Sequence, residues 1–191
     1  MLKIFTKYIK NGSGGVNMTK NLLILGAGGH GAVVKETALA LGCYGKVDFL
    51  DDKAEIAIGK FKDIKNFVDD YHHAFVSVGN NEQRKKLIEE LNDAGFHLPV
   101  LVHPTAYISP LVTIGKGSIV SATAVVNSNV LVETGCIISI GALVDHDSIV
   151  GEYSHINSGA VVKAGSRVDR LTKIDAGMVY MNDAELKKVY F

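Results

Sequence analysis

The chain is short of cysteine, proline and tryptophan, and it has no excess of charge of either sign. Its 191 residues include two cysteines, three prolines, no tryptophan, and 20 basic against 20 acidic side chains. A net charge of zero disfavours the class of proteins that bind nucleic acid by neutralising its phosphates. Cys43 and Cys136 are far apart and form neither a metal-binding spacing nor a disulfide framework. This usage predicts reduced thiols in a cytoplasmic protein.

Long apolar runs are also missing. The longest uncharged stretch, residues 117–132, is interrupted by serine, threonine and asparagine. No run of about 20 apolar residues is available to span a bilayer, so no membrane partner is expected. Three lysines break up the first ten residues, which therefore lack the apolar centre of a secretory signal. We interpret residues 1–17, which include the sequence NGSGG, as an extension or tag outside the fold.

From Asn21 the chain alternates between short apolar runs and segments with helical patterning. Asn80 or Asn81 can cap the last helix, and Gly95 can end it. Such alternation predicts a small parallel sheet with helices on its faces, an α/β domain of Rossmann-like layout over residues 18–98. The expected strands are 22–25, 47–50 and 74–78, and the expected helices are 30–41, 63–71 and 82–94.

After Pro99 an internal repeat of six residues begins. Thirteen positions at this interval are all valine or isoleucine: Val102, Ile108, Ile114, Val120, Val126, Val132, Ile138, Val144, Val150, Ile156, Val162, Val168 and Ile174. Most residues four places later are small, so each repeat has one β-branched and one small inward position. A period of six indicates short strands joined by tight corners.

This pattern resembles the hexapeptide-repeat left-handed β-helix, in which three repeats form one triangular coil. Thirteen repeats would make a little over four coils across residues 99–179, followed by a C-terminal tail at 180–191. Glycines are expected to form the corners: Gly115, Gly117, Gly135, Gly141, Gly151, Gly159, Gly165 and Gly177. Because a solenoid exposes open ends and flat faces, caps or self-association are expected.

A glycine motif, LLILGAGGHG, follows the first expected strand and places Gly26, Gly28 and Gly31 in G-x-G-x-x-G spacing. Asp51 and Asp52 follow about 20 residues later, after the next strand. Glycines allow a backbone to approach a diphosphate, helix-start amides donate to it, and a carboxylate accepts hydrogen bonds from ribose or base. The motif therefore indicates a nucleotide site, although glycines that only permit a tight turn remain the alternative.

Two further polar residues lie at the same expected edge of the sheet. His30 either approaches a phosphate or sugar, or is an ordinary loop residue. Asn80 follows another strand, where open α/β sheets bind ligands, but it can equally cap the next helix. The basic run Arg84, Lys85 and Lys86 is expected to form the solvent-facing side of that helix.

Within the repeats, the stretch VDHDSIVGEYSHIN concentrates acidic residues and two histidines. His146 stands outside both inward positions, so the core of the coil does not require it. A histidine beside carboxylates can accept a proton near neutral pH, which is consistent with a functional role, but the spacing alone favours an ordinary polar surface residue. A metal site formed by Asp145, His146 and His155 is a weaker possibility.

The combination of GAGGHG, FLDD, VGNNEQRKK, hexapeptide repeats and HDSIVGEYSHIN resembles the bacterial sugar acetyltransferases. These include UDP-amino-sugar N-acetyltransferases of glycan synthesis and sialic acid O-acetyltransferases. The resemblance covers residues 20–165 and implies a trimer with acetyl-CoA as co-substrate and no metal. It implies that His146 is the general base, that Asp147 orients it, and that His155 lines the acetyl-CoA cleft. The residues it assigns to the UDP part of the substrate are Gly26, Gly28, Gly29, His30, Asp51 and Asp52.

The implied chemistry is direct acetyl transfer to an amine or hydroxyl of the sugar, without a covalent enzyme intermediate. Backbone amides near Ala164 and Gly165 are expected to stabilise the oxyanion. Cys136 occupies a small inward position, which favours core packing over a nucleophilic role.

The chain departs from the family pattern at its C-terminus, where MVYMNDAELKKVYF replaces further coils and a segment containing glycine, asparagine and proline. A charged segment at 182–188 is expected to cap the solenoid. Two alternatives follow. One is a catalytically silent sugar-nucleotide-binding or scaffold protein. The other takes the glycine motif literally as a site for NAD-dependent redox chemistry, but the first domain is short for a full dinucleotide-binding fold.

Overall fold

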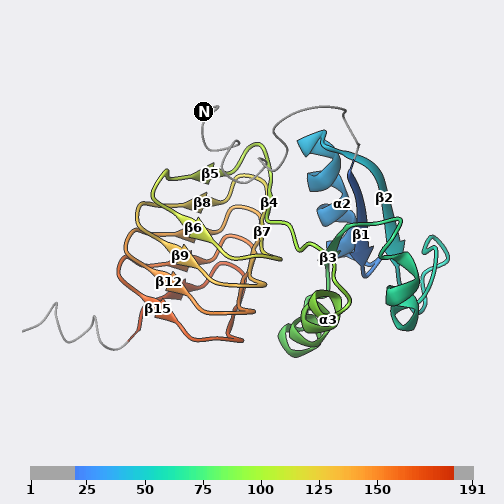
Figure 1. Ribbon diagram of the computed structural model, residues 1–191. Coiled ribbons are helices and arrows are strands. Elements are labelled where there is room, and N and C mark those ends of the chain that lie inside the picture. Colours follow the sequence, from blue (N-terminus) through green and yellow to red (C-terminus); the bar gives the residue numbers. More distant parts are fainter. Residues whose placement is uncertain (1–19, 183–191) are drawn as a thin grey trace, which may run out of the picture. The chain divides into compact units, whose positions relative to one another are not determined.

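The structure is a computed structural model that describes residues 20–182 and divides the chain into two compact units, Met1–Leu101 and Val102–Phe191 (Figure 1). The predicted extension at 1–17 lies outside the described residues. So do residues 183–191, which contain most of the predicted C-terminal tail and cap.

The first unit contains a three-stranded parallel sheet in the order β2-β1-β3 (Figure 1). Its strands are β1 (Lys20–Leu25), β2 (Tyr44–Leu50) and β3 (His73–Val76). Leu22, Leu23, Ile24 and Leu25 are fully buried, as expected for a central parallel strand covered on both faces. The sequence-based prediction of an α/β domain is confirmed.

Helices α2 (Gly29–Leu41) and α3 (Asn81–Asp93) follow β1 and β3. Helix α2 ends at Gly42, whose left-handed φ of 64° suits a glycine C-cap. The predicted helix at 63–71 is wrong in type and extent, because the segment forms a 3₁₀ helix, η1 (Phe61–Phe67). Asp63 accepts the amide of Lys60 at 3.0 Å, a local cap that begins this helix two residues before the predicted start.

The second unit is a parallel β-solenoid in which every strand is two residues long. Three sheets run along it, in the orders β16-β13-β10-β7-β4, β17-β14-β11-β8-β5 and β15-β12-β9-β6 (Figure 1). Its strands are β4 (Leu101–Val102), β5 (Tyr107–Ile108), β6 (Thr113–Ile114), β7 (Ile119–Val120), β8 (Val125–Val126), β9 (Leu131–Val132), β10 (Ile137–Ile138), β11 (Leu143–Val144), β12 (Ile149–Val150), β13 (His155–Ile156), β14 (Val161–Val162), β15 (Arg167–Val168), β16 (Lys173–Ile174) and β17 (Val179–Tyr180).

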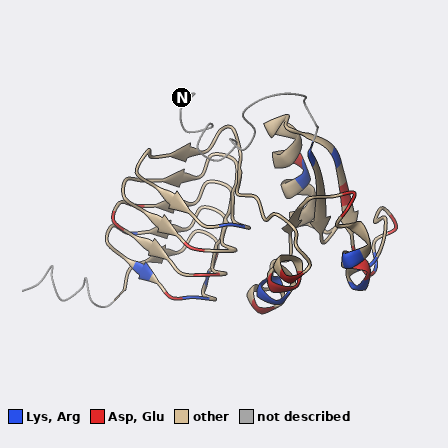
Figure 2. Ribbon diagram, in the orientation of Figure 1, with Lys and Arg blue, Asp and Glu red and all other residues tan. Residues whose placement is uncertain are grey.

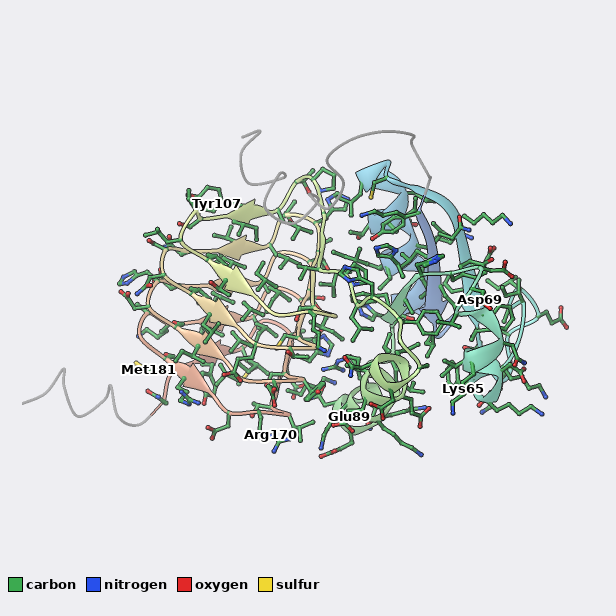
Figure 3. The ribbon with its side chains drawn as sticks, viewed as in Figure 1. Lys65, Asp69, Glu89, Tyr107, Arg170 and Met181 are labelled. Atoms are coloured by element: carbon green, nitrogen blue, oxygen red, sulfur yellow. The ribbon has the colours of Figure 1, made fainter. Side chains whose placement is uncertain are left out.

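The hexapeptide pattern forms the solenoid core. Leu143 pairs with Val125 and Val161, each 18 residues away, so three repeats make one coil as predicted. The second residue of each strand points inward, and from Val120 to Val168 these residues are fully buried, so that side chains fill the coils (Figure 3). The predicted end of the repeat at Ile174 is one strand early, because Tyr180 continues the interval where the pattern expected valine or isoleucine.

From Gly117 to Gly177, corners recur three residues after the inward valine or isoleucine, where the backbone turns left-handed. Glycine fills six corners, namely Gly117, Gly135, Gly141, Gly159, Gly165 and Gly177; the others are Thr123, Asn129, Asp147, Tyr153 and Leu171. Gly115 and Gly151, predicted as corners, are required for a different reason. A Cβ on either would approach backbone atoms of the next coil to 2.6 Å.

Charged residues of the solenoid gather at its corners, whereas the strands are almost free of them (Figure 2). Within residues 20–182, no helix has the length and hydrophobicity needed to cross a membrane.

Candidate functional site

The glycine loop connects β1 to α2 and is shaped by two of its glycines. Gly26 has a φ of 108°, which side-chain-bearing residues rarely adopt, and a Cβ on Gly31 would lie 2.2 Å from the carbonyl oxygen of Gly26. By contrast, a Cβ on Gly28 or Gly29 would meet no atom within 4 Å. The fold thus requires Gly26 and Gly31, whereas the space above Gly28 and Gly29 is open to a ligand.

The N-terminus of α2 has the features of an anion-binding end. Gly28 is its N-cap and supplies no side-chain hydrogen bond, and the first turn contains no acidic residue. The first amides of a helix have no partner within the helix, and the helix dipole favours negative charge there.

Asp51 and Asp52 have different surroundings. Asp51 accepts the Ala27 amide through Oδ2 at 2.9 Å, and the amides of Lys53 and Ala54 through Oδ1 at 2.8 and 3.0 Å. The Ala27 bond is the largest cause that lowers the pKa of Asp51. Asp51 therefore holds the glycine loop in shape, while Asp52 is exposed and accepts only the Phe61 amide, at 3.1 Å, among the described residues.

His30 follows the loop and is largely enclosed. Burial, and then the charge of Arg84, lower its pKa to about 4, so the ring is neutral at pH 7. Among the described residues, no hydrogen-bond partner reaches its Nε2 atom. A neutral imidazole at this place can donate or accept a hydrogen bond without a charge cost.

The prediction that Arg84 lies on the solvent-facing side of α3 is wrong. Arg84 is fully buried, on the same face of the helix as Leu87, Ile88 and Leu91. Its guanidinium donates to the carbonyl of Val78 at 3.0 Å and to Oδ1 of Asn81 at 2.7 Å. Arg84 thus braces the turn between β3 and α3. Lys85 and Lys86, in contrast, form ion pairs with Glu89 and Glu90, both at 3.9 Å.

Asn80 lies at the same edge of the sheet and caps α3, accepting the Gln83 amide through Oδ1 at 2.9 Å. The capping alternative is therefore confirmed, and it leaves a ligand role for the Nδ2 group untested. Sequence reasoning missed Ser77, whose hydroxyl donates to the carbonyls of Leu25 and Gly26 at 2.9 and 2.6 Å. Its position at the end of a buried strand was the available signal.

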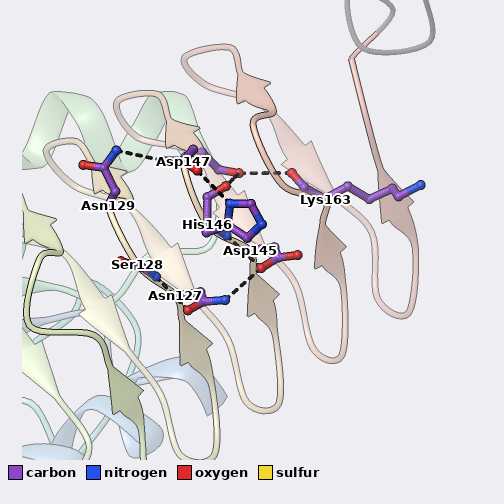
Figure 4. A network of polar contacts seen from close by, with 8 residues as sticks. Asn127, Ser128, Asn129, Asp145, His146, Asp147 and Lys163 are labelled. Atoms are coloured by element: carbon purple, nitrogen blue, oxygen red, sulfur yellow. Dashed lines mark hydrogen bonds and ion pairs between the residues drawn. The ribbon is translucent and has the colours of Figure 1, made fainter. Parts of the chain in front are cut away.

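The second candidate site is the solenoid corner between β11 and β12, which carries Asp145, His146 and Asp147 (Figure 4). Nδ1 of His146 lies 2.7 Å from Oδ2 of Asp147, and both side chains are more than half exposed. Hydrogen bonds from Asn129 and then His146 lower the pKa of Asp147, which is therefore ionised at neutral pH. Because a carboxylate only accepts, Nδ1 must carry the hydrogen, and Nε2 becomes the basic nitrogen of the neutral ring.

Two asparagines of the preceding coil support this corner, and sequence reasoning missed them. Asn129 donates to Oδ1 of Asp147 at 2.7 Å, and Asn127 donates to Oδ1 of Asp145 at 2.9 Å (Figure 4). The Asn127 bond is the largest cause that lowers the pKa of Asp145, whose Oδ1 also accepts the His146 amide. The 18-residue coil was the available signal, since 127 and 129 precede 145 and 147 by one coil.

His155 does not belong to the same corner within one chain. It lies on β13, in a different sheet from β11 and β12, and its Nε2 is 2.9 Å from the hydroxyl of Ser139. Within the described residues, no group of three or more potential ligands can hold a metal ion, so the alternative of a metal site at Asp145, His146 and His155 finds no support.

Ala164 and Gly165 form the corner one coil beyond His146. The amide of Gly165 donates to the carbonyl of His146 at 2.8 Å, so its hydrogen is not available to an oxyanion. The amides of Ser128 and His146 occupy the same place as the Ala164 amide in the two preceding coils. They donate to the side chains of Asn127 and Asp145. The residue before Ala164 is Lys163, which has no side-chain acceptor, and the amide of Ala164 donates to no atom of residues 20–182.

Cys136 is fully buried, and its thiol lies 3.2 Å from the carbonyl of Gly151. Its position agrees with core packing rather than a nucleophilic role, because a buried thiol in apolar surroundings is inert.

Comparison with known proteins extends the resemblance to both units. The PglD N-terminal domain family matches residues 21–91. UDP-N-acetylbacillosamine N-acetyltransferase of Bacillus subtilis is 31% identical over 113 residues, covering 54% of this chain and 52% of that protein. The matched region is therefore about half the length of this curated relative.

Two solved structures match over most of the chain. The acetyltransferase domain of PglB from Neisseria gonorrhoeae is 34% identical with a TM-score of 0.75, covering 86% of this chain and 94% of that one; it is also known in complex with acetyl coenzyme A. PerB from Caulobacter crescentus, in complex with CoA and GDP-perosamine, is 26% identical with a TM-score of 0.74, covering 85% of this chain and 89% of that one.

An α/β domain followed by a left-handed β-helix of hexapeptide repeats defines the architecture of an acyltransferase class, and the predicted fold class is confirmed. Within that class, the chain belongs to the sugar acetyltransferase family of these relatives.

Proposed function

We propose that this chain is an acetyl-CoA-dependent N-acetyltransferase that acts on the amine of a nucleotide-linked amino sugar, with His146 as general base. One observation carries the proposal: the exposed His146 ring is paired through Nδ1 with the ionised carboxylate of Asp147. Named relatives that transfer acetyl groups to sugar amines support the same reaction.

In the proposed reaction, Nε2 of His146 takes a proton from the sugar amine as the nitrogen attacks the thioester carbonyl carbon. A nitrogen–carbon bond forms, the carbon–sulfur bond breaks, and His146 returns the proton to the departing sulfur of coenzyme A. The Asp147 carboxylate stabilises the imidazolium while it exists.

The amide of Ala164 is the proposed oxyanion donor and, with His155, the proposed contact to acetyl-CoA. It lies one coil from His146, and no side chain caps it within the described part of the chain. A preformed donor at the developing negative charge lowers the barrier because it needs no reorganisation. Gly165 contributes by holding the backbone of His146.

For the nucleotide part of the substrate, we propose the open loop at Gly28 and Gly29 with the N-terminal amides of α2. Asp52 and Asn80 are exposed and lie after β2 and β3, and His30 is neutral. Gly26 and Asp51 act indirectly, by shaping the loop. Backbone donors suit a diphosphate in a chain that has no overall positive charge.

We further propose a trimer whose subunits meet through the sheet β17-β14-β11-β8-β5. Its outward side chains are all apolar and form one ladder, Tyr107, Val125, Leu143, Val161 and Val179. The side chains of Tyr107, Leu143 and Val179 are 54%, 41% and 62% exposed in the single chain, and leaving such an apolar surface in contact with water is unfavourable. Figure 3 labels Tyr107 at the first of these strands. The His146 corner borders this sheet, so a second subunit can supply His155, which its own chain holds on another face.

Thiol release from acetyl-CoA tests the proposal, with UDP- and GDP-linked amino sugars and matched hydroxy sugars as acceptors. We expect release only with amino sugars. Release with hydroxy sugars alone would contradict N-acetylation. No release, with thermal stabilisation by the sugar nucleotide but not by acetyl-CoA, would instead indicate a silent binding protein.

A further inference from the structure

The corner that carries His146 is stacked on a corner of similar composition. The β11 pairing with β8 aligns Asn127, Ser128 and Asn129 with Asp145, His146 and Asp147, 18 residues later. Backbone hydrogen bonds fix this alignment on both sides: the Asn127 amide donates to Val144 at 2.9 Å, and the Asp147 amide donates to Ser128 at 3.0 Å. The side chains at 129 and 147 are therefore held in register by the sheet and not by chance contact.

The two side chains form a directed chain of hydrogen bonds that ends at the imidazole. The amide group of Asn129 donates to Oδ1 of Asp147, and Oδ2 of Asp147 accepts from Nδ1 of His146, with both distances at 2.7 Å (Figure 4). With both oxygens engaged, the carboxylate plane is fixed toward the ring. Without Asn129, an exposed aspartate can rotate among its rotamers and lose that orientation.

The backbone at these two positions is unfavourable for residues with side chains. Asn129 and Asp147 have φ values of 59° and 58°, in the left-handed region that glycine fills at six equivalent corners. Asparagine and aspartate tolerate this region better than most residues but less well than glycine. The chain therefore keeps functional groups at two stacked corners where glycine would relieve the backbone.

We infer that Asn129 is a positioning residue for catalysis: it fixes the Asp147 carboxylate, which in turn holds His146 in the tautomer with a basic Nε2. This inference rests on the proposed role of His146 as general base. Asn127 acts in parallel on Asp145, whose Oδ1 also accepts the His146 amide and so fixes the backbone of the same residue.

The test is Asn129→Gly, with Thr123→Gly as matched control. Thr123 has a φ of 57° at the preceding corner, between β7 and β8, so both changes relieve a left-handed residue and remove a short polar side chain. We expect Asn129→Gly to match the control in thermal midpoint, while its kcat falls about tenfold to a hundredfold with little change in either KM. Thr123→Gly should keep wild-type kcat.

A spectroscopic measurement separates this inference from the proposed function. Nitrogen-15 shifts of the histidine rings, with the His146 signal assigned through His146→Ala, should show the Nδ1–H tautomer in the wild type and a tautomer mixture in Asn129→Gly. Unchanged tautomer and kcat would overturn the positioning role, as would a kcat loss that only follows a lower midpoint than the control. If His146→Ala keeps full turnover, the proposed function fails, and the tautomer result still decides the role of Asn129.

Discussion

At the scale of single residues, His146 stands out because its ring is paired with a carboxylate, and not because it is buried. It is exposed, contributes nothing to the solenoid core, and is paired with an ionised carboxylate. We predict that His146→Ala lowers turnover at least about a hundredfold, because a positioned base typically contributes that much, with little effect on the thermal midpoint. The check is steady-state thiol release, with His103→Ala in the first coil as control. Normal turnover would remove His146 from the mechanism.

The glycine loop allows a second residue-scale prediction, since two of its glycines serve opposite purposes. Gly28→Ala should fold normally, because its φ of −77° suits alanine and its Cβ meets no atom, but it should weaken sugar-nucleotide binding at least about tenfold by filling the ligand space. Gly31→Ala should lower stability by about 1–3 kcal/mol, because its Cβ collides with Gly26. Calorimetric titration and thermal unfolding check the pair. Equal nucleotide affinity in Gly28→Ala and the wild type would contradict the assigned subsite.

At the scale of elements, the start of β3 is a point of acid sensitivity. The rings of His73 and His97 lie 4.7 Å apart, where their residues form a bridge. Burial, followed by the charges of His97, Lys20 and His72, lowers the pKa of His73 to about 4, and burial lowers that of His97. An unfolded histidine titrates near 6.5, so between these values the unfolded chain binds more protons and stability falls as pH falls.

We therefore predict that the His73 and His97 pair contributes about 1–2 kcal/mol to the stability that the first unit loses between pH 7 and pH 4, a value reduced for the partial exposure of His73. His30, whose pKa is also lowered to about 4, adds to this loss. Urea unfolding followed by helical circular dichroism reports this unit, because the α-helices of the described chain lie in it. His73→Phe should reduce the pH dependence and leave the part due to His30. His103→Phe, a change in the second unit, is the control. An identical slope in His73→Phe would assign the acid sensitivity to other groups.

At the scale of the whole molecule, the proposed trimer depends on the apolar ladder. One charge placed on it should prevent association, because an unpaired charge at an apolar interface is costly to desolvate. Leu143→Glu is predicted to convert the proposed trimer to monomers in light scattering coupled to gel filtration, with a large loss of turnover. Thr113→Glu, an equal change of charge at the exposed residue of a strand in another sheet, should leave the mass unchanged. A trimer in Leu143→Glu would place the interface elsewhere.

Different features of the site were predictable to different degrees. The pairing of His146 with Asp147 and the strand–loop–helix setting of the glycines could be inferred, because both depend on residues near in sequence. The support from Asn129, the burial of Arg84 and the loop-shaping role of Asp51 could not. Each depends on a contact made after folding: across one coil, along one helical face, or between β2 and the glycine loop.

The sequence by itself determined the two architectures, since a period of six built from β-branched residues specifies a coil, and alternating strands and helices specify a parallel sheet. Its shortage of cysteine and of net charge disfavoured disulfide frameworks and polyanion binding. Only the tertiary structure decided which polar groups remain available for chemistry. Neighbours brought together in folding take up the hydrogen-bonding groups of Gly165 and Asp51, which are thereby committed to structure. Within residues 20–182, the Ala164 amide keeps no acceptor and the Asp52 side chain stays exposed.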